Sequence, residues 1–461
     1  MNVRELAVNM LDEVELKGKL CHRVQQETLS AFPALPANDR AFLIRLFHGT
    51  LERQETIDRL LLIRTGRETK KQKPKLRNIL RTAVYQLLFM EVPDSAAVNE
   101  AVELTKKRGL GGLSGMVNGV LRALSREKTK AGGTNDLLRG LSETLPPSER
   151  TAFLYSLPLW LVRYWEEQYD RETVEKMAAS FLTEGRTVIR LREGDPEGAG
   201  LRGAFSENTG ILPALFAENA RILRNPGALD RNEYFLKGAF AIQDESSILT
   251  GNIAPLKAGD VVIDLCAAPG GKTCHLADRL TALGGGTVYA GDKDPKKLPQ
   301  ISENAERLGL RNVRTEVWDA EKFNPEFAGK ADLVLADLPC SGLGVIGRKP
   351  DIKRKTVRED ITALAEIGQR ILTNAAAYVK PGGYLLFSTC TVTEEENAGG
   401  CRRLTELGLS PVDLTDRLPA ALKGEPGVRE GRLQLLPGLH GTDGFFISLF
   451  QKPVDRVNRE G

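Results

Sequence analysis

Residues 261–273 read VVIDLCAAPGGKT, and this stretch decides the fold. A β-branched apolar run ends in an acid and a turn of small residues, and helix-forming residues follow two glycines. Comparable apolar runs recur downstream, separated by amphipathic segments such as 295–309 and 357–379. Alternation of strands and helices over about 210 residues predicts a doubly wound α/β sheet. Because ligands bind such sheets at the carboxyl ends of the strands, we expect the functional residues there.

The expected strands of this sheet are 261–266, 287–292, 313–318, 331–337, 382–390 and 444–452. Pro299 falls inside the helix expected over 295–309 and predicts a kink near its first turn. Residues 1–125 instead show helical spacing of apolar residues throughout and predict an all-α bundle.

We therefore expect a multidomain chain. Its parts are a helical bundle over 1–130, a linker with a small α+β subdomain over 131–237, a Rossmann-like α/β domain over 238–453, and a polar tail over 454–461. The linker is expected at EKTKAGGTND (127–136), which is polar and contains two glycines. The subdomain includes a strand-like run, TVIRLR, and a glycine-rich loop, EGDPEGAG (193–200).

Composition excludes several classes of protein. The six cysteines contain no C-x-x-C pair and the four histidines do not cluster with them, so neither a metal site nor a disulfide framework is expected. No stretch approaches the roughly 18 apolar residues of a membrane span. The first residues, MNVRELAVNM, lack the apolar core of a secretory leader. A cytoplasmic protein without a membrane partner is expected, with a monomer as the default.

Charge is distributed unevenly along the chain. Residues 1–130 hold 23 Lys and Arg against 15 Asp and Glu, whereas the whole chain has a net charge of only +3. Eight basic residues lie between Arg64 and Arg81. A run of charge is often only a solvated helix face, but a basic domain joined to an acidic one favours a polyanionic partner such as nucleic acid.

The glycine turn after the first strand favours a nucleotide-like cofactor. GGKT resembles the end of a phosphate-binding loop, but that motif needs glycine where Cys266 stands. Asp292 ends the second strand 21 residues after Gly271, at the distance where an acid accepts hydrogen bonds from ribose hydroxyls. Asp319 follows the third strand, where it can bind an adenine amino group. An adenosyl cofactor fits these acids, although a nicotinamide dehydrogenase would show them too.

Two cysteines at neighbouring strand ends distinguish these alternatives. DLPCSG (337–342) places Cys340 after the fourth strand, and FSTCT (387–391) places Cys390 after the fifth. Single free cysteines are often inert core residues, but both of these are flanked by polar residues. A use for two thiols is methylation of carbon 5 of a cytosine, where one thiolate adds to carbon 6 and a second group assists removal of the proton on carbon 5.

These motifs resemble the RNA cytosine-5 methyltransferases of the NOL1/NOP2/Sun family. The resemblance rests on DLCAAPGGKT (264–273), DLPCSGLGVIGRKPDIK (337–353) and FSTCT, with support from GAFAIQDESS (238–247) and LLPGLHGTDGFFISLF (435–450). Together they cover nearly all of 238–452.

The resemblance implies S-adenosyl-L-methionine as cofactor and Cys390 as the nucleophile. Cys340 then assists product release, and Asp337 contacts the target base or the methionine part of the cofactor. The implied cofactor-binding residues are Cys266, Ala267, Ala268, Pro269, Gly270, Gly271, Lys272, Asp292, Lys297, Asp319 and Asp337. Two departures from the family pattern are Leu338, where alanine is usual, and Gly347, where a basic residue is common.

The N-terminal part is similar to the NusB-type RNA-binding bundle, through ANDRAFLIRLFHGTL (37–51), LRTAVYQLLF (80–89) and VNEAVELTKKRG (98–109). A NusB-like bundle with this catalytic domain implies action on small-subunit (16S) ribosomal RNA, free or partly assembled. The basic residues expected to bind RNA phosphates next to the first cysteine are Arg348, Lys349, Lys353 and Arg354. The target base must leave its stack to reach the thiol.

Three alternatives remain open from the sequence. The first is a small-molecule or amine methyltransferase of the same fold, which would not need Cys390. The second is a non-catalytic RNA-binding assembly factor. The third keeps the chemistry and changes the substrate to transfer RNA.

Overall fold

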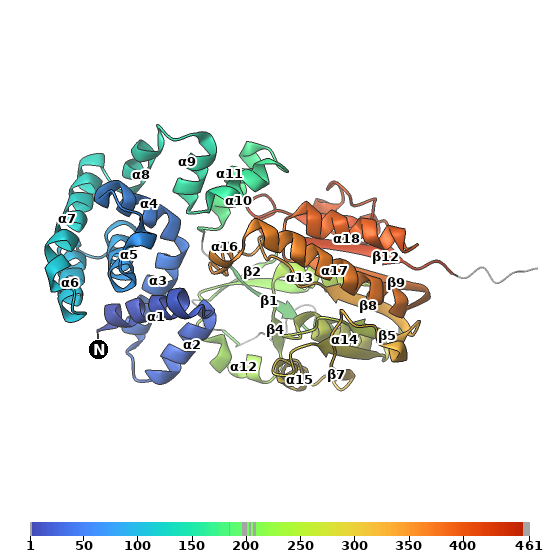
Figure 1. The fold of residues 1–461 in the computed structure, drawn as a ribbon. Helices are drawn as coiled ribbons and strands as arrows, with labels where there is room; N and C mark the ends of the chain where they lie inside the picture. The colour runs from blue at the N-terminus through green and yellow to red at the C-terminus, as the bar shows by residue number, and fades with distance from the viewer. Residues whose placement is uncertain (1, 184, 196–200, 202–203, 206–208, 455–461) are drawn as a thin grey trace, which may run out of the picture. The chain divides into compact units, whose positions relative to one another are not determined.

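The computed structural model describes residues 2–183, 185–195, 201, 204–205 and 209–454 (Figure 1). The chain forms two compact units, each described below by itself. Unit 1 comprises Met1–Thr183 and Ile346–Lys355, and unit 2 comprises Glu184–Val345 and Thr356–Gly461. Within the described ranges, every helix is too short or too polar to cross a membrane.

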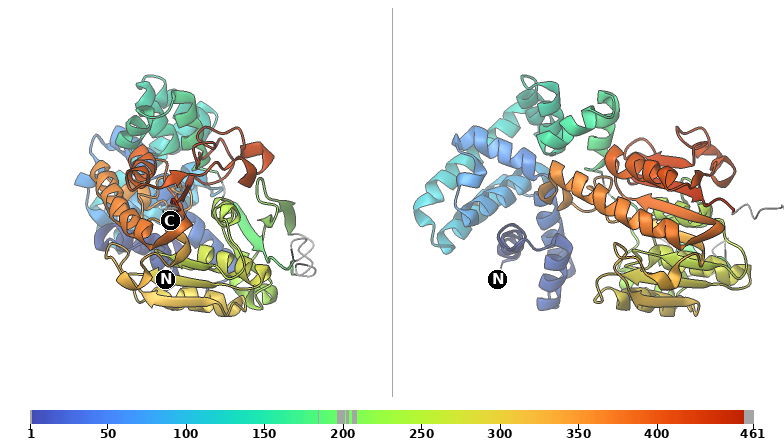
Figure 2. Two further views of the ribbon diagram at one scale, coloured as in Figure 1. Left: turned by 90° about the vertical axis from the view of Figure 1, so that its right-hand side faces the viewer. Right: turned by 45° about the vertical axis from the view of Figure 1, so that its right-hand side comes forward.

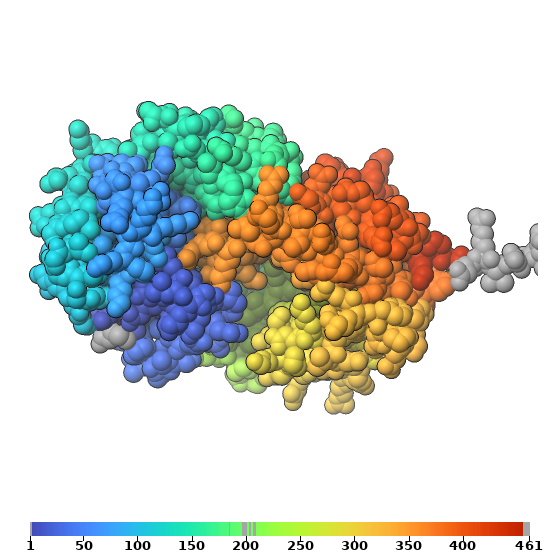
Figure 3. All heavy atoms as spheres, in the orientation of Figure 1, coloured from blue at the N-terminus to red at the C-terminus, as the bar shows by residue number. Residues whose placement is uncertain are grey.

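Unit 1 is all helical. Its helices are α1 (Val3–Lys17), α2 (Cys21–Ala31), α3 (Ala37–Glu52), α4 (Gln54–Thr65), α5 (Pro74–Phe89), α6 (Asp94–Lys107), α7 (Ser114–Ala131), α8 (Thr134–Ser142), α9 (Pro147–Tyr155), α10 (Leu159–Glu166), α11 (Arg171–Ser180) and α16 (Ile352–Lys355). In Figure 3 the residues of α1 to α11 are coloured blue to green, and the later segment that contains α16 is orange.

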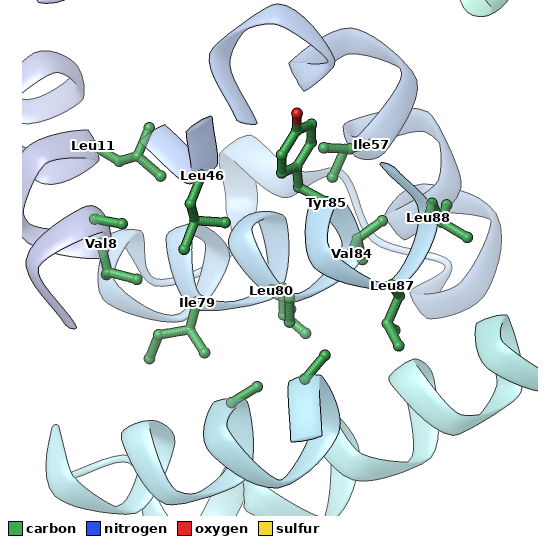
Figure 4. Packing of buried hydrophobic residues seen from close by; sticks show 14 of the residues in the cluster. Val8, Leu11, Leu46, Ile57, Ile79, Leu80, Val84, Tyr85, Leu87 and Leu88 are labelled. Atoms are coloured by element: carbon green, nitrogen blue, oxygen red, sulfur yellow. The ribbon is translucent and has the colours of Figure 1, made fainter. Parts of the chain in front are cut away.

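Helix α5 is the centre of the bundle. Every residue from Leu76 to Leu88 is buried, so this helix is covered on all sides. Figure 4 shows Ile79, Leu80 and Val84 of α5 among residues from α1, α3 and α4. The fold of residues 1–125 predicted from helical spacing is confirmed.

The linker expected over 127–136 is wrong. Helix α7 continues to Ala131, and Gly132 ends it in the left-handed conformation at φ 90°. Gly133, also at positive φ, lets α8 begin at once, and Leu137 and Leu138 of α8 pack into the bundle core. The glycine pair is therefore a helix cap and turn, and the helical unit extends to residue 183 rather than 130.

A short segment from the middle of the α/β sequence also belongs to unit 1. Lys353 donates from Nζ to the backbone carbonyls of Glu52, at the end of α3, and Ser156, just after α9. The backbone N–H of Cys21 donates to Asp351 at 2.7 Å. The expected continuous domain over 238–453 is thus interrupted, because residues 346–355 complete the helical core.

The basic run of α5 is partly structural. Arg81 is 2% exposed and donates to both carboxylate oxygens of Asp58, at 2.7 and 2.6 Å, and to Glu15 at 3.0 Å. Arg77 donates to Glu15 at 3.1 Å and is also buried. These two arginines pair with the partly buried carboxylates of Asp58 and Glu15 and are not available to a nucleic acid.

Unit 2 begins with a small antiparallel sheet in the order β2-β3-β1-β4. Its strands are β1 (Thr187–Leu191), β2 (Gly210–Pro213), β3 (Ala220–Arg224) and β4 (Phe240–Ile242), with α12 (Glu233–Leu236) before β4. The sheet shares a core with the large domain, where Val188 and Ile222 cluster with Leu276, so the boundary expected at 237 is not observed. The expected loop over 193–200 lies partly, and the tail over 454–461 almost wholly, outside the described residues.

The large sheet has the order β10-β12-β9-β8-β5-β6-β7, with β11 paired to β12. Its strands are β5 (Val261–Asp264), β6 (Thr287–Asp292), β7 (Val313–Val317), β8 (Ala331–Asp337), β9 (Val379–Thr389), β10 (Ser410–Pro411), β11 (Arg432–Leu435) and β12 (Phe445–Gln451). The helices are α13 (Glu245–Ile253), α14 (Gly271–Leu283), α15 (Leu298–Arg307), α17 (Arg358–Tyr378) and α18 (Glu394–Glu406).

Alternate residues of β5 face two different cores. Val262 belongs to the cluster that includes Leu276 of α14, whereas Ile263 belongs to the cluster that includes Ile371 of α17. Helices therefore cover both faces of a mostly parallel sheet, as Figure 2 shows, and the doubly wound fold predicted from strand–helix alternation is confirmed. The kink expected at Pro299 is wrong, because α15 begins at Leu298 and proline fits the first turn.

Replacing Arg81 tests the structural role of the basic run. Arg81→Met removes the arginine partner of Asp58 and one of the two arginine partners of Glu15, and we expect a loss of about 3 kcal/mol in the free energy of unfolding. Lys75→Met, at an exposed position of the same helix, should change it by less than about 0.5 kcal/mol. Urea denaturation followed by circular dichroism measures both, and equal effects would contradict the assignment.

Candidate active site

The site lies where the strand order reverses. Strands β6 and β7 follow on one side of β5, and β8 and β9 lie on the other. The carboxyl ends of β5 and β8 are therefore the switch point at which such sheets bind ligands. A cavity of about 260 Å³ opens there, and its lining residues are Leu265, Cys266, Ala268, Asp292, Lys293, Lys297, Trp318, Asp319, Ala320, Glu321, Asp337, Leu338, Pro339, Cys340, Ile367, Ile371 and Cys390.

The loop after β5 forms one wall of the cavity. Gly270, at φ 100°, turns the chain into α14. If another residue stood at this position, its Cβ atom would lie 3.0 Å from the Cα of Ile301. Below the loop, the buried carboxylate of Asp264 accepts a hydrogen bond from the Thr273 hydroxyl at 2.6 Å. Burial raises the pKa of Asp264 to about 7. The loop is thus held by contacts that point away from the cavity, leaving Cys266 and Ala268 to line it.

The acids predicted at strand ends line the same cavity. Asp292 is the last residue of β6, and its Oδ1 accepts the backbone N–H of Asp294 at 2.9 Å. Lys297 Nζ lies 3.9 Å from that oxygen. Asp319 stands two residues beyond the end of β7 rather than at its last position.

Lys272 does not line the cavity and contacts Asp337 instead. Its Nζ donates to Asp337 Oδ2 at 2.7 Å, while Ser388 donates its hydroxyl to Asp337 Oδ1 at 2.7 Å. Burial acts to lower the pKa of Lys272, but the Asp337 carboxylate outweighs it and the pKa is raised. The ammonium also lies 5.0 Å from the centroid of the Phe445 ring. Asp337 is therefore held at the end of β8 by an ion pair with Lys272.

The two predicted thiols are adjacent. Strands β8 and β9 pair in parallel with Asp337 opposite Ser388, so the loops that follow start side by side. Cys340 Sγ lies 3.4 Å from Cys390 Sγ. The hydrogen bond to Cys390 and burial raise the pKa of Cys340 well above that of an ordinary thiol.

Several lining residues were missed by the sequence analysis. Trp318 precedes Asp319, and Ile367 and Ile371 lie on the buried side of α17. The signal was present as the apolar stripe of the helix expected over 357–379, but a stripe of this kind does not distinguish core from cavity wall. Lys293 and Glu321 carry no pattern of their own.

The structure contradicts the RNA contact expected at Lys353. Its side chain is buried in unit 1, where burial lowers its pKa to about 8 and two backbone carbonyls accept hydrogen bonds from its ammonium group. It cannot reach a phosphate without unfolding that contact. Arg354 is half-buried, whereas Arg348 and Lys349 are exposed.

The described residues show no cluster of possible metal ligands. No group of three or more His, Cys, Asp or Glu side chains there is arranged to hold a metal ion. All six cysteines are free thiols.

Comparison with known proteins agrees with this geometry. Residues 252–451 match the family model described as 16S rRNA methyltransferase RsmB/F, and residues 1–126 match the NusB family. The probable ribosomal RNA small subunit methyltransferase B of Bacillus subtilis (strain 168) is 34% identical, over 98% of this chain and 99% of the relative. Ribosomal RNA small subunit methyltransferase B of Vibrio cholerae is 30% identical over 98% of both chains.

Solved structures share the fold. A crystal structure titled PH0851 matches with a TM-score of 0.76 at 24% identity, over 98% of this chain and 99% of that one. NSun6 from Pyrococcus horikoshii, solved with the S-adenosylmethionine analogue SFG, matches with a TM-score of 0.57 at 23% identity, over 66% of this chain and all of that one. The chain belongs to the S-adenosylmethionine-dependent family of ribosomal RNA small subunit methyltransferase B.

Proposed function

We propose that the protein methylates carbon 5 of a cytosine in 16S ribosomal RNA through a transient covalent bond between Cys390 and carbon 6 of the base. The observation that carries the proposal is the 3.4 Å separation of Cys340 Sγ and Cys390 Sγ beside the cavity at the switch point. A methyltransferase that acts on a more nucleophilic atom needs no thiol. A covalent adduct accounts for two thiols in contact, because one sulfur bonds to the base and the other assists its release.

The cavity fits an adenosyl cofactor. Carboxylate oxygens at Asp292 and Asp319 suit ribose hydroxyls and an amino group, and Trp318 and Ile371 offer apolar walls. Bound there, S-adenosylmethionine supplies an electrophilic methyl group. The residues that would hold it are Cys266, Ala268, Asp292, Lys297 and Asp319.

The thiols divide the work on the base. The Cys390 thiolate adds to carbon 6, which makes carbon 5 electron-rich enough to take the methyl group. A base then removes the proton on carbon 5, and the carbon–sulfur bond breaks to restore the ring and the thiolate. Cys340 Sγ, which lies 3.4 Å from Cys390 Sγ, is placed to assist this release. Asp337, which accepts a hydrogen bond from Lys272, can also accept one from the amino group of cytosine.

RNA binding is assigned to unit 1. A cavity of about 790 Å³ is lined by four residues of the basic run, Arg64, Arg67, Lys71 and Lys73, and by an apolar floor that includes Leu113 and Met116. No acidic residue is among the described residues that line it. The basic residues of this cavity suit phosphates, and its apolar residues suit an unstacked base.

Replacing the cysteines singly tests the covalent step. Cys390→Ser should reduce methyl transfer by on the order of a thousandfold or more and form no adduct, whereas Cys340→Ser should accumulate protein bound covalently to RNA. Cys401→Ser, a thiol of α18 outside the cavity, should behave as wild type.

The readouts are bisulfite sequencing of 16S ribosomal RNA and denaturing gel electrophoresis, with transfer RNA tested in parallel. An adduct that survives in Cys390→Ser would exchange the roles of the thiols. Methylation of transfer RNA alone would refute the proposed substrate, and full activity in Cys390→Ser would refute the mechanism.

Replacing three basic residues that line this cavity tests whether it binds RNA. The triple variant Arg67→Gln, Lys71→Gln, Lys73→Gln should weaken RNA binding and lower the slope of log affinity against log salt by about 2, as expected for three lost phosphate contacts. The matched control replaces three exposed lysines of other helices, Lys17, Lys106 and Lys176, with glutamine. Fluorescence anisotropy at several salt concentrations measures both, and equal slopes would rule out this surface.

A further inference from the structure

The start of α18 departs from the local structure that its sequence indicates. Thr393-Glu394-Glu395-Glu396 matches a capping box, in which the glutamate returns to the backbone N–H of the threonine. The threonine instead makes no capping hydrogen bond, and its hydroxyl donates to Glu396 Oε2 at 2.6 Å. Glu396 is 5% exposed. The buried Glu396 carboxylate therefore does not complete a capping box at the start of α18.

Glu396 connects the two loops that carry the thiols. Its Oε1 accepts the backbone N–H of Ser341 at 2.7 Å, and its Oε2 accepts the Ser341 hydroxyl at 2.6 Å. The Ser341 hydroxyl lies 2.7 Å from that of Thr391. Ser341 directly follows Cys340, and Thr391 directly follows Cys390. One carboxylate therefore fixes the neighbours of both sulfurs.

The energetics favour a rigid connection. Hydrogen bonds to an ionised carboxylate are short and strong, and this one accepts three. Burial raises the pKa of Glu396, while the donors from Ser341 and Thr393 oppose that shift. Glu396 does not line the cavity, so it is placed to act on the thiols through Ser341 rather than on a ligand.

We propose that Glu396 is a positioning residue whose carboxylate holds Ser341 against Thr391 and thereby sets the separation of the Cys340 and Cys390 sulfurs. The inference rests on the proposed function only for the catalytic use of that separation. The geometric part concerns the protein alone and is tested without RNA.

A trivalent arsenical measures the separation directly. Phenylarsine oxide bridges two close thiols, with two arsenic–sulfur bonds formed and the arsenical oxygen leaving as water with both thiol protons. We expect the wild type and Glu395→Gln, an exposed neighbour on the same turn, to capture one equivalent, read by intact mass. Glu396→Gln should capture it at least tenfold more slowly, because the amide nitrogen has no lone pair for Ser341 or Thr393. Cys340→Ser, which lacks one of the two sulfurs, should not form the bridge.

Steady-state kinetics then separate positioning from binding. Glu396→Gln should lower kcat at least tenfold and leave KM for ribosomal RNA and for the cofactor within twofold. If Glu396→Gln fails to fold, Ser341→Ala decides instead, since it removes the hydroxyl that joins Glu396 to Thr391 and should slow arsenical capture severalfold. Unchanged capture in the folded variant, or a loss confined to KM, overturns the proposal. Slowed capture in a protein that proves not to methylate cytosine would retain the geometric role and refute only the proposed function.

Discussion

The parallel pairing of β8 with β9 is the contact on which the catalytic centre depends. It sets Asp337 opposite Ser388, so that the two loops leave the sheet side by side and bring their cysteines into contact. Both strands are largely buried, and β8 lies next to β5, whose following loop lines the same cavity. Three adjacent strands end at this point of the sheet, and their loops bring the two sulfurs and the cofactor cavity together.

The loop after β8 contributes residues to both units of the chain. Its first residues bear Cys340, and its later residues belong to unit 1, where the buried Lys353 binds the carbonyls at the ends of two helices. Cys340 of this segment thus lines the cavity of unit 2, and Lys353 of the same segment is buried in unit 1. A charged residue in this loop was expected to bind RNA, but the cost of leaving two helix-end carbonyls unpaired gives it a structural role instead.

Local patterns were enough to predict the sheet, the glycine turn and both cysteines, because each depends on residues close together in the chain. The errors arose where the outcome depends on distant contacts. The glycines at 132 and 133 have the composition of a linker, and only the burial of Leu137 shows that they form a tight turn. The contact of Glu396 with Ser341, 55 residues away, likewise has no local signature.

Trapping the adduct tests the central claim most directly. Fluorine at carbon 5 cannot leave as a proton does, so RNA made with 5-fluorocytidine should hold the protein covalently after methyl transfer. Digestion and tandem mass spectrometry of the trapped complex then identify the bonded residue. The account predicts a nucleotide on the peptide that contains Cys390. A nucleotide on Cys340, or complete turnover of the fluorinated RNA without any bond to sulfur, would contradict it.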